Sequence, residues 1–160
     1  MKIALSQMKV TSSSFAADGQ IPTRYTQLGE DVSPQLAWSD VPEGTVSFAV
    51  VCHDPDAPIL HEGSYGVPHW VLYNIPGDVR EIAEGDDRSF TAGLTYLGKP
   101  GYIGPKPPPG HGVHHYYFMV FALDEDLKLT KHIEMPTLLK SIEPSTLGMS
   151  RLIGTYEQPG

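Results

Sequence analysis

The segment Thr45–Pro58 has the sequence T-V-S-F-A-V-V-C-H-D-P-D-A-P, and the interpretation of the whole chain depends on it. Its first half is a nearly continuous apolar run, rich in β-branched residues and apolar on both alternating faces. A run of about eight such residues predicts a strand in the interior of a sheet. The run stops at Asp54-Pro55-Asp56-Ala57-Pro58, because proline cannot donate a hydrogen bond to a neighbouring strand. Two carboxylates are therefore predicted on a stiff turn at the end of a core strand.

Other segments also have the pattern of strands. Two are strongly apolar: residues 69–75, H-W-V-L-Y-N-I, and residues 117–123, Y-F-M-V-F-A-L. Weaker alternation of apolar and polar residues predicts further strands within residues 3–15, 33–38 and 152–156. The many prolines and glycines, 15 and 16 of 160 residues, are typical of tight turns between short strands. The chain is therefore expected to be mainly β.

Two short helices are expected near the C-terminus. Pro136 can start a short helix that runs to Ile142, and Ser145 can cap a second one. The charged residues 78–90 are expected to form a solvated loop or a short helix.

Length and charge limit the function. A chain of 160 residues is expected to form one domain, over residues 1–160, with a substantial core. The 19 acidic residues exceed the 11 basic ones, giving a net charge of −8, which argues against nucleic acid as a partner. The single cysteine, Cys52, lies in the predicted core strand and fits a reducing compartment. No apolar stretch resembles a signal peptide or a membrane span, so we expect a cytoplasmic protein without membrane insertion.

The predicted strands bring polar residues to one end of a sheet. If the strands at 45–53 and 69–75 are antiparallel, Asp54 and His69 lie at the same end. If the strand at 115–123 is also antiparallel to the first, His114 and Tyr116 arrive there too. Loops at the end of a rigid β scaffold are a common place for binding sites. We therefore expect a binding site at this end.

Three groups of residues resemble the phosphatidylethanolamine-binding proteins, most closely the bacterial and archaeal branch often called Raf kinase inhibitor-like proteins. The first is D-P-D-A-P at 54–58, followed by His69, and the second is G-P-K-P-P-P-G-H-G-V-H-H-Y at 104–116. The third comprises shorter matches at 33–38, 42–50 and 154–156, so the resemblance covers nearly the whole chain. The resemblance implies a two-sheet antiparallel β-sandwich, Greek-key-like, with one or two short C-terminal helices.

The resemblance also implies a small pocket for a phosphate head group. Its ligand-binding residues would be Asp54, His69, Lys106, Pro108, His114 and Tyr116. The imidazole and phenol groups would donate hydrogen bonds to the anion, and Asp54 would orient and charge a histidine. Supporting residues would be Asp56, which fixes the turn, Pro58 and His115. The Ala57–Pro58 bond is expected to be cis.

Two residues depart from the family pattern. His115 stands where the family usually has Arg, and Val67 stands where it usually has Trp. The pocket is therefore expected to be shallower and to take its positive charge chiefly from imidazoles. Asp54 is expected to raise the pKa of these imidazoles above about 6.5.

The predicted function is non-enzymatic binding of a phosphate-bearing small molecule or lipid head group, without a cofactor. An inhibitor or regulator of a kinase or protease is a further interpretation, and a homodimer is left open. The alternative is a metal-dependent hydrolase that would use a cluster of acidic and histidine side chains, Asp54, Asp56, His69, His111 and His114. No local metal-ligand spacing supports this alternative.

Overall fold

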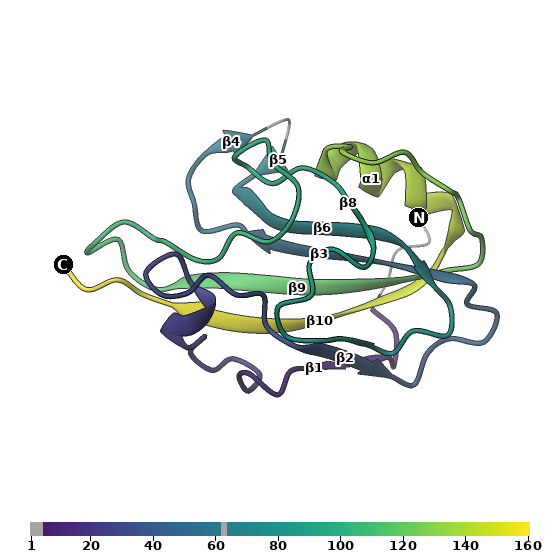
Figure 1. Ribbon diagram of the computed structural model, residues 1–160, viewed down its shortest axis with the longest axis horizontal. Helices are drawn as coiled ribbons and strands as arrows, with labels where there is room; N and C mark the ends of the chain where they lie inside the picture. Colours follow the sequence, from purple (N-terminus) through teal and green to yellow (C-terminus); the bar gives the residue numbers. More distant parts are fainter. Residues whose placement is uncertain (1–4, 62–63) are drawn as a thin grey trace.

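The computed structural model describes residues 5–61 and 64–160 and shows a mainly β protein built on one large antiparallel sheet (Figure 1). The sheet has five strands in the order β10-β9-β3-β6-β8. Their bounds are Thr146–Tyr156 for β10, His114–Leu123 for β9, Ser47–Asp54 for β3, Val67–Pro76 for β6 and Thr91–Ala92 for β8. The three strongly apolar segments of the sequence are therefore the three central strands.

The smaller elements lie around this sheet. A three-stranded sheet has the order β1-β2-β7, with bounds Lys9–Thr11, Leu36–Ser39 and Glu81–Ile82. The strand β4, Leu60–His61, pairs antiparallel with β5, Ser64–Tyr65. The helices are η1, Thr23–Tyr25, α1, Met135–Ile142, and η2, Glu143–Ser145. No helix among the described residues is long and apolar enough to cross a membrane.

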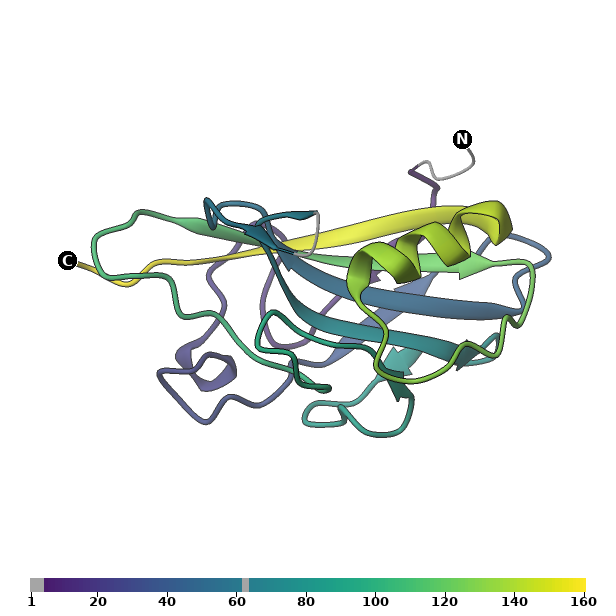
Figure 2. The same ribbon diagram turned by 90° about the horizontal axis from the view of Figure 1, so that it is seen from above.

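Both faces of the central strand β3 are covered, which explains why its sequence is apolar throughout. On one face, Phe48 and Cys52 belong to a core shared with Trp38 of the small sheet. On the other face, Val51 belongs to a second core with Leu138 of α1. Figures 1 and 2 show α1 on one side of the large sheet and β1 with β2 on the other. The expected sandwich of two antiparallel sheets is therefore confirmed, with one helical segment on the outer face.

The C-terminal helical segment differs from the prediction at its end. The helix predicted from Pro136 to Ile142 is present as α1, and its buried residues Met135, Leu138 and Ile142 have helical spacing. The second helix predicted after Ser145 is wrong, because β10 begins at the next residue and pairs with β9. The Ser145 hydroxyl hydrogen-bonds the Glu125 side chain at 3.3 Å and caps no helix.

Two further segments, residues 78–90 and 3–15, agree only in part with their predictions. The charged segment 78–90 is a loop, as expected, but it also contributes the short strand β7 to the small sheet. Within residues 3–15, the structure has the strand β1, whereas Ile3 lies outside the described residues.

Candidate functional site

A cavity of about 340 Å³ lies at the end of the large sheet where β3 stops and β6 and β9 begin. It lies there because β3 pairs antiparallel with both neighbours: Asp54 is opposite Val67, and His53 is opposite Tyr117. The cavity is lined by all six predicted ligand-binding residues, Asp54, His69, Lys106, Pro108, His114 and Tyr116, and also by Pro58. The convergence expected from the strand order is therefore present in the structure.

Alternation along β9 decides which side chains face the cavity. His114 and Tyr116 are buried and line it, whereas His115 between them is exposed and does not. His115 instead binds the turn after β3: its backbone N–H and its ring Nδ1 lie 2.6 and 2.7 Å from Oδ2 of Asp56. Burial raises the pKa of Asp56, but the hydrogen bonds from His115 outweigh it, and the pKa is lowered. Asp56 and His115 thus tie the turn to β9 without facing the cavity.

The turn itself is closed by hydrogen bonds. The Asp56 N–H donates to Oδ1 of Asp54 at 2.8 Å, and the Ile59 N–H donates to the Ala57 carbonyl at 2.7 Å. The described residues contain no cis peptide bond, so the prediction for Ala57–Pro58 is wrong. The hydrogen bond from the Asp56 N–H fixes the direction in which the Asp54 carboxylate points.

A chain of hydrogen bonds runs from the Asp54 carboxylate to the surface. Oδ2 of Asp54 lies 2.7 Å from Nδ1 of His114, and Nε2 of His114 lies 2.7 Å from Nδ1 of His111. Asp54 and His114 are each 3% exposed, whereas His111 is exposed. The carboxylate can only accept, so Nδ1 of His114 carries a hydrogen, and Nε2 shares one with His111. Both ring nitrogens of His114 are thus engaged within the protein.

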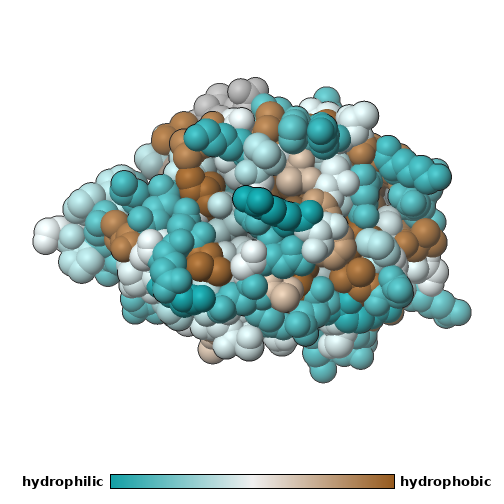
Figure 3. Space-filling view, viewed as in Figure 1, coloured by the Kyte–Doolittle hydropathy of each residue, from teal (hydrophilic) through white to brown (hydrophobic). Residues whose placement is uncertain are grey.

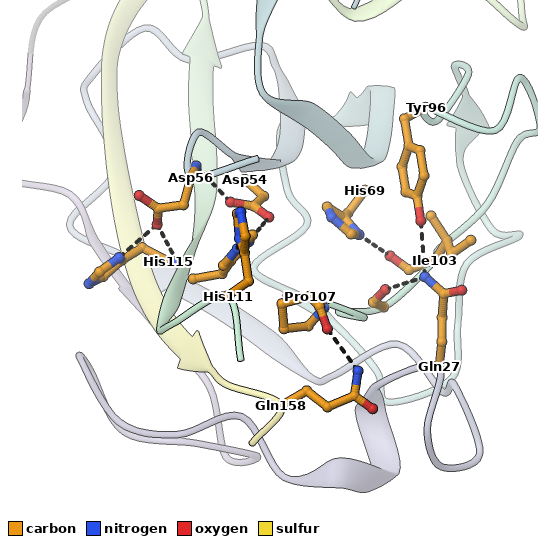
Figure 4. Close-up of polar contacts among 12 residues, drawn as sticks. Gln27, Asp54, Asp56, His69, Tyr96, Ile103, Pro107, His111, His115 and Gln158 are labelled. Atoms are coloured by element: carbon orange, nitrogen blue, oxygen red, sulfur yellow. Dashed lines mark hydrogen bonds and ion pairs between the residues drawn. The ribbon is translucent and has the colours of Figure 1, made fainter. Parts of the chain in front are cut away.

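His69 lies on the other side of the cavity, where its Nδ1 is 2.7 Å from the carbonyl oxygen of Ile103 (Figure 4). Burial lowers its pKa to about 4, although the Ile103 carbonyl and the Asp54 charge act in the opposite direction. The expectation that Asp54 would raise the pKa of the pocket imidazoles is therefore wrong for His69. Loss of hydration outweighs the attraction to the carboxylate, because the ring is almost fully enclosed.

Tyr116 places a phenol between the two histidines. Its ring meets the His69 ring edge-on at 5.2 Å and stacks beside the His114 ring at 6.5 Å. Burial, followed by the charge of Asp54, raises the pKa of the Tyr116 hydroxyl above its ordinary value. The hydroxyl therefore keeps its proton at neutral pH and is available as a hydrogen-bond donor.

The proline-rich segment 103–109 forms a wall that other parts of the chain hold in place. The Gln158 side chain donates to the Pro107 carbonyl at 2.8 Å, and the Gln27 side chain donates to the Gly104 carbonyl at 2.9 Å (Figure 4). The Gly104 N–H donates to the Asp31 carboxylate at 2.7 Å. These bonds fix a segment whose prolines have no N–H of their own, so the wall is rigid and mostly apolar.

Some lining residues were not predicted for this pocket. Tyr96 comes from a glycine-rich stretch without periodicity, and Ile59 comes from the loop after the turn. His111 was named only as a metal ligand, although it lies within the motif at 104–116. Its two neighbours, Gly110 and Gly112, have φ values of 72° and 90° that fit glycine, and His111 between them lines the cavity.

The residues named for a metal site are only partly together. Asp54, His69, His111 and His114 line the cavity, whereas Asp56 faces away from it. Among the described residues, no group of three or more histidine, cysteine or acidic side chains is arranged to hold a metal ion. The hydrolase alternative thus gains no support from the geometry.

Comparison with known proteins matches this sequence and this fold to one family. The family model described as phosphatidylethanolamine-binding protein matches residues 11–157. A UPF0098 protein from Aquifex aeolicus is 40% identical over 157 residues, which cover 94% of this chain and 89% of that protein.

Two solved structures are similar along nearly their whole length. The first is a putative phosphatidylethanolamine-binding protein homolog, CT736 from Chlamydia trachomatis, with 34% identity and a TM-score of 0.86 over 94% of this chain and 97% of that one. The second is YbcL from E. coli, described as a member of the mammalian family, with 30% identity and a TM-score of 0.87 over 95% and 99%. The chain therefore belongs to the phosphatidylethanolamine-binding protein family.

Proposed function

We propose that this protein binds the phosphate group of a small molecule or lipid head group in the cavity at the end of the large sheet, without chemical turnover. The observation that carries the proposal is the position of Tyr116, whose buried hydroxyl lies between two histidines in a cavity that also has Lys106 at its lining. Phosphate oxygens need hydrogen-bond donors and positive charge, and this set of side chains supplies both.

Each polar side chain has a separate part in this proposal. Tyr116 donates its O–H to a phosphate oxygen, and Lys106 contributes a positive charge from the exposed wall. Both oxygens of Asp54 already accept hydrogen bonds, from the Asp56 N–H and from His114. Asp54 therefore orients His114 and does not contact the anion itself. The apolar proline wall encloses the group that carries the phosphate.

A binding role without catalysis agrees with the chemistry of the lining. The described lining residues include no serine, threonine or cysteine that could act as a nucleophile. Cys52 lies nearby on β3 but is fully buried, and burial raises the pKa of its thiol well above the ordinary value. Regulation of a kinase or protease remains a prediction from the sequence resemblance.

Calorimetric titration with inorganic phosphate and with phosphoethanolamine tests this function. The variant Tyr116→Phe removes only the hydroxyl, and we expect it to weaken binding by about 1–3 kcal/mol, the range for a hydrogen bond to a charged group. The control is Tyr117→Phe, the same change at the next residue, whose ring faces Arg151 on the opposite side of the sheet. Equal affinity of the two variants would reject the proposed site.

A further inference from the structure

The hydrogen bond between His69 and Ile103 determines which ring nitrogen of His69 carries a hydrogen. Nδ1 lies 2.7 Å from the Ile103 carbonyl oxygen. A carbonyl oxygen can only accept a hydrogen bond, so Nδ1 must be the donor. A neutral imidazole has one N–H, and Nε2 of a neutral His69 is therefore an acceptor with a free lone pair.

His69 is neutral over the pH range in which proteins usually work. Its side chain is 3% exposed, and burial lowers its pKa to about 4. The ionisable groups that face it are Asp54 and His53 from β3, Tyr116 from β9 and Tyr96 from the loop before the proline wall. The charge of Asp54 favours a protonated ring, but it does not overcome the loss of hydration.

The acceptor nitrogen faces the cavity. In Figure 4 one nitrogen of the His69 ring points to Ile103, and the other lies on the side of Asp54 and His111. An anion oxygen placed against this nitrogen brings two lone pairs together unless the oxygen carries a hydrogen. Asp54 cannot supply that hydrogen, because its oxygens accept hydrogen bonds from the Asp56 N–H and from His114. A ligand with a hydrogen of its own completes this pair without changing the protonation of His69.

We infer that the cavity selects a phosphate monoester in its singly ionised form, whose P–OH donates to Nε2 of His69 while an ionised oxygen accepts from Tyr116. An oxyanion of the same shape and charge without a hydroxyl binds more weakly. This inference rests on the proposed function and adds the protonation state of the ligand, and it disfavours a phosphodiester, which has no P–OH. It also gives His69 the part of an acceptor, where the sequence had suggested a donor.

Methyl phosphate and methyl sulfate are a matched pair of probes for this inference. Near pH 5 both carry one negative charge, because the second ionisation of a phosphate monoester lies near pH ~6, and they differ by one hydroxyl. We expect methyl phosphate to bind the wild-type protein at least about tenfold more tightly, since the unpaired acceptor of His69 is otherwise left buried. Calorimetry at one pH keeps the protonation of the free protein the same for both probes.

The variant His69→Gln identifies the source of the preference. Its side-chain amide can either donate or accept at the position of Nε2, so the preference for methyl phosphate should fall to about twofold or less. The control is His132→Asn, a distant exposed histidine whose φ of 65° suits asparagine, and it should keep the wild-type preference.

A second measurement does not depend on the folding of the variant. The ¹⁵N chemical shift of Nε2 of His69 in the wild-type protein should be that of a nitrogen without hydrogen, and at equal concentration it should move further with methyl phosphate than with methyl sulfate. Three results would each overturn the inference but leave the proposed function standing. They are a protonated Nε2, equal affinities for the two probes, and a preference that persists in His69→Gln. If neither probe binds, the proposed function fails as well.

Discussion

At the level of single residues, the two pocket histidines differ because their neighbours differ. His114 pairs with the Asp54 carboxylate, which is an acceptor, and with His111. His69 has a backbone carbonyl as its nearest partner, and burial keeps it neutral. The same side chain can therefore serve as an anchored ring in one place and as an acceptor in the other.

The lowered pKa of His69 predicts that acid destabilises the protein. An unfolded imidazole takes up a proton below about pH 6.5, whereas the folded protein takes it up only below about pH 4. Between these values the unfolded state binds more protons, so the free energy of unfolding falls as the pH is lowered. His69 contributes about 3 kcal/mol to this loss over the window, at about 1.4 kcal/mol per pH unit, and this contribution should be absent from His69→Gln. Urea unfolding of both proteins between pH 7 and pH 4 measures it, and parallel curves would show that His69 is not the source.

At the level of elements, the turn after β3 and the start of β6 are packed too closely for a side chain. Gly66 has a φ of 82°, and a Cβ built on it would lie 2.1 Å from the Asp54 carbonyl oxygen. The residue therefore needs to be glycine both for its backbone conformation and for the approach of the two segments that frame the cavity.

Substitution of Gly66 should damage the fold next to the cavity. Gly66→Ala should lower the free energy of unfolding by well over the roughly 1 kcal/mol expected for a left-handed backbone alone, and it should weaken phosphate binding. Gly98→Ala is the control, since Gly98 also has a positive φ, of 69°, but an added Cβ meets nothing within 4 Å. Thermal unfolding and calorimetry give both readouts. Similar losses for the two variants would mean that the contact with Asp54 does not matter.

The sequence predicted the central strands because their apolar runs reflect burial on both faces. The start of β10 was missed, since T-L-G-M-S at 146–150 has neither a long apolar run nor strict alternation. Its pairing with β9 keeps it in the sheet, with an irregularity between Thr146 and Gly148. Tertiary pairing thus overrides the local signal at this position.

The cavity was predictable as far as strand order decides it. Asp54, His69, His114 and Tyr116 all lie at strand ends, and antiparallel pairing places those ends together. The contribution of Tyr96 to the cavity lining was not predictable, because Tyr96 comes from a loop whose path depends on partners distant in the sequence. The hydrogen donated by His69 to Ile103 was equally hidden, since no sequence pattern joins residues 34 positions apart.

At the level of the whole molecule, α1 packs on one face of the large sheet and the small sheet packs on the other. The cavity lies at the end of the large sheet, which neither of them covers. Figure 3 shows a surface in which polar residues surround separate apolar patches, and the net charge is −8. A negative molecule does not attract anions at long range. The proposed binding therefore depends on short-range hydrogen bonds inside the cavity, with Lys106 as the nearby positive charge.

The most direct test is a crystal structure of the protein grown near pH 5 with methyl phosphate. We expect the anion in the cavity, with one oxygen at hydrogen-bond distance from the Tyr116 hydroxyl and another from Nε2 of His69. An anion bound elsewhere on the surface, or a cavity that holds only water at a saturating concentration of methyl phosphate, would contradict the account.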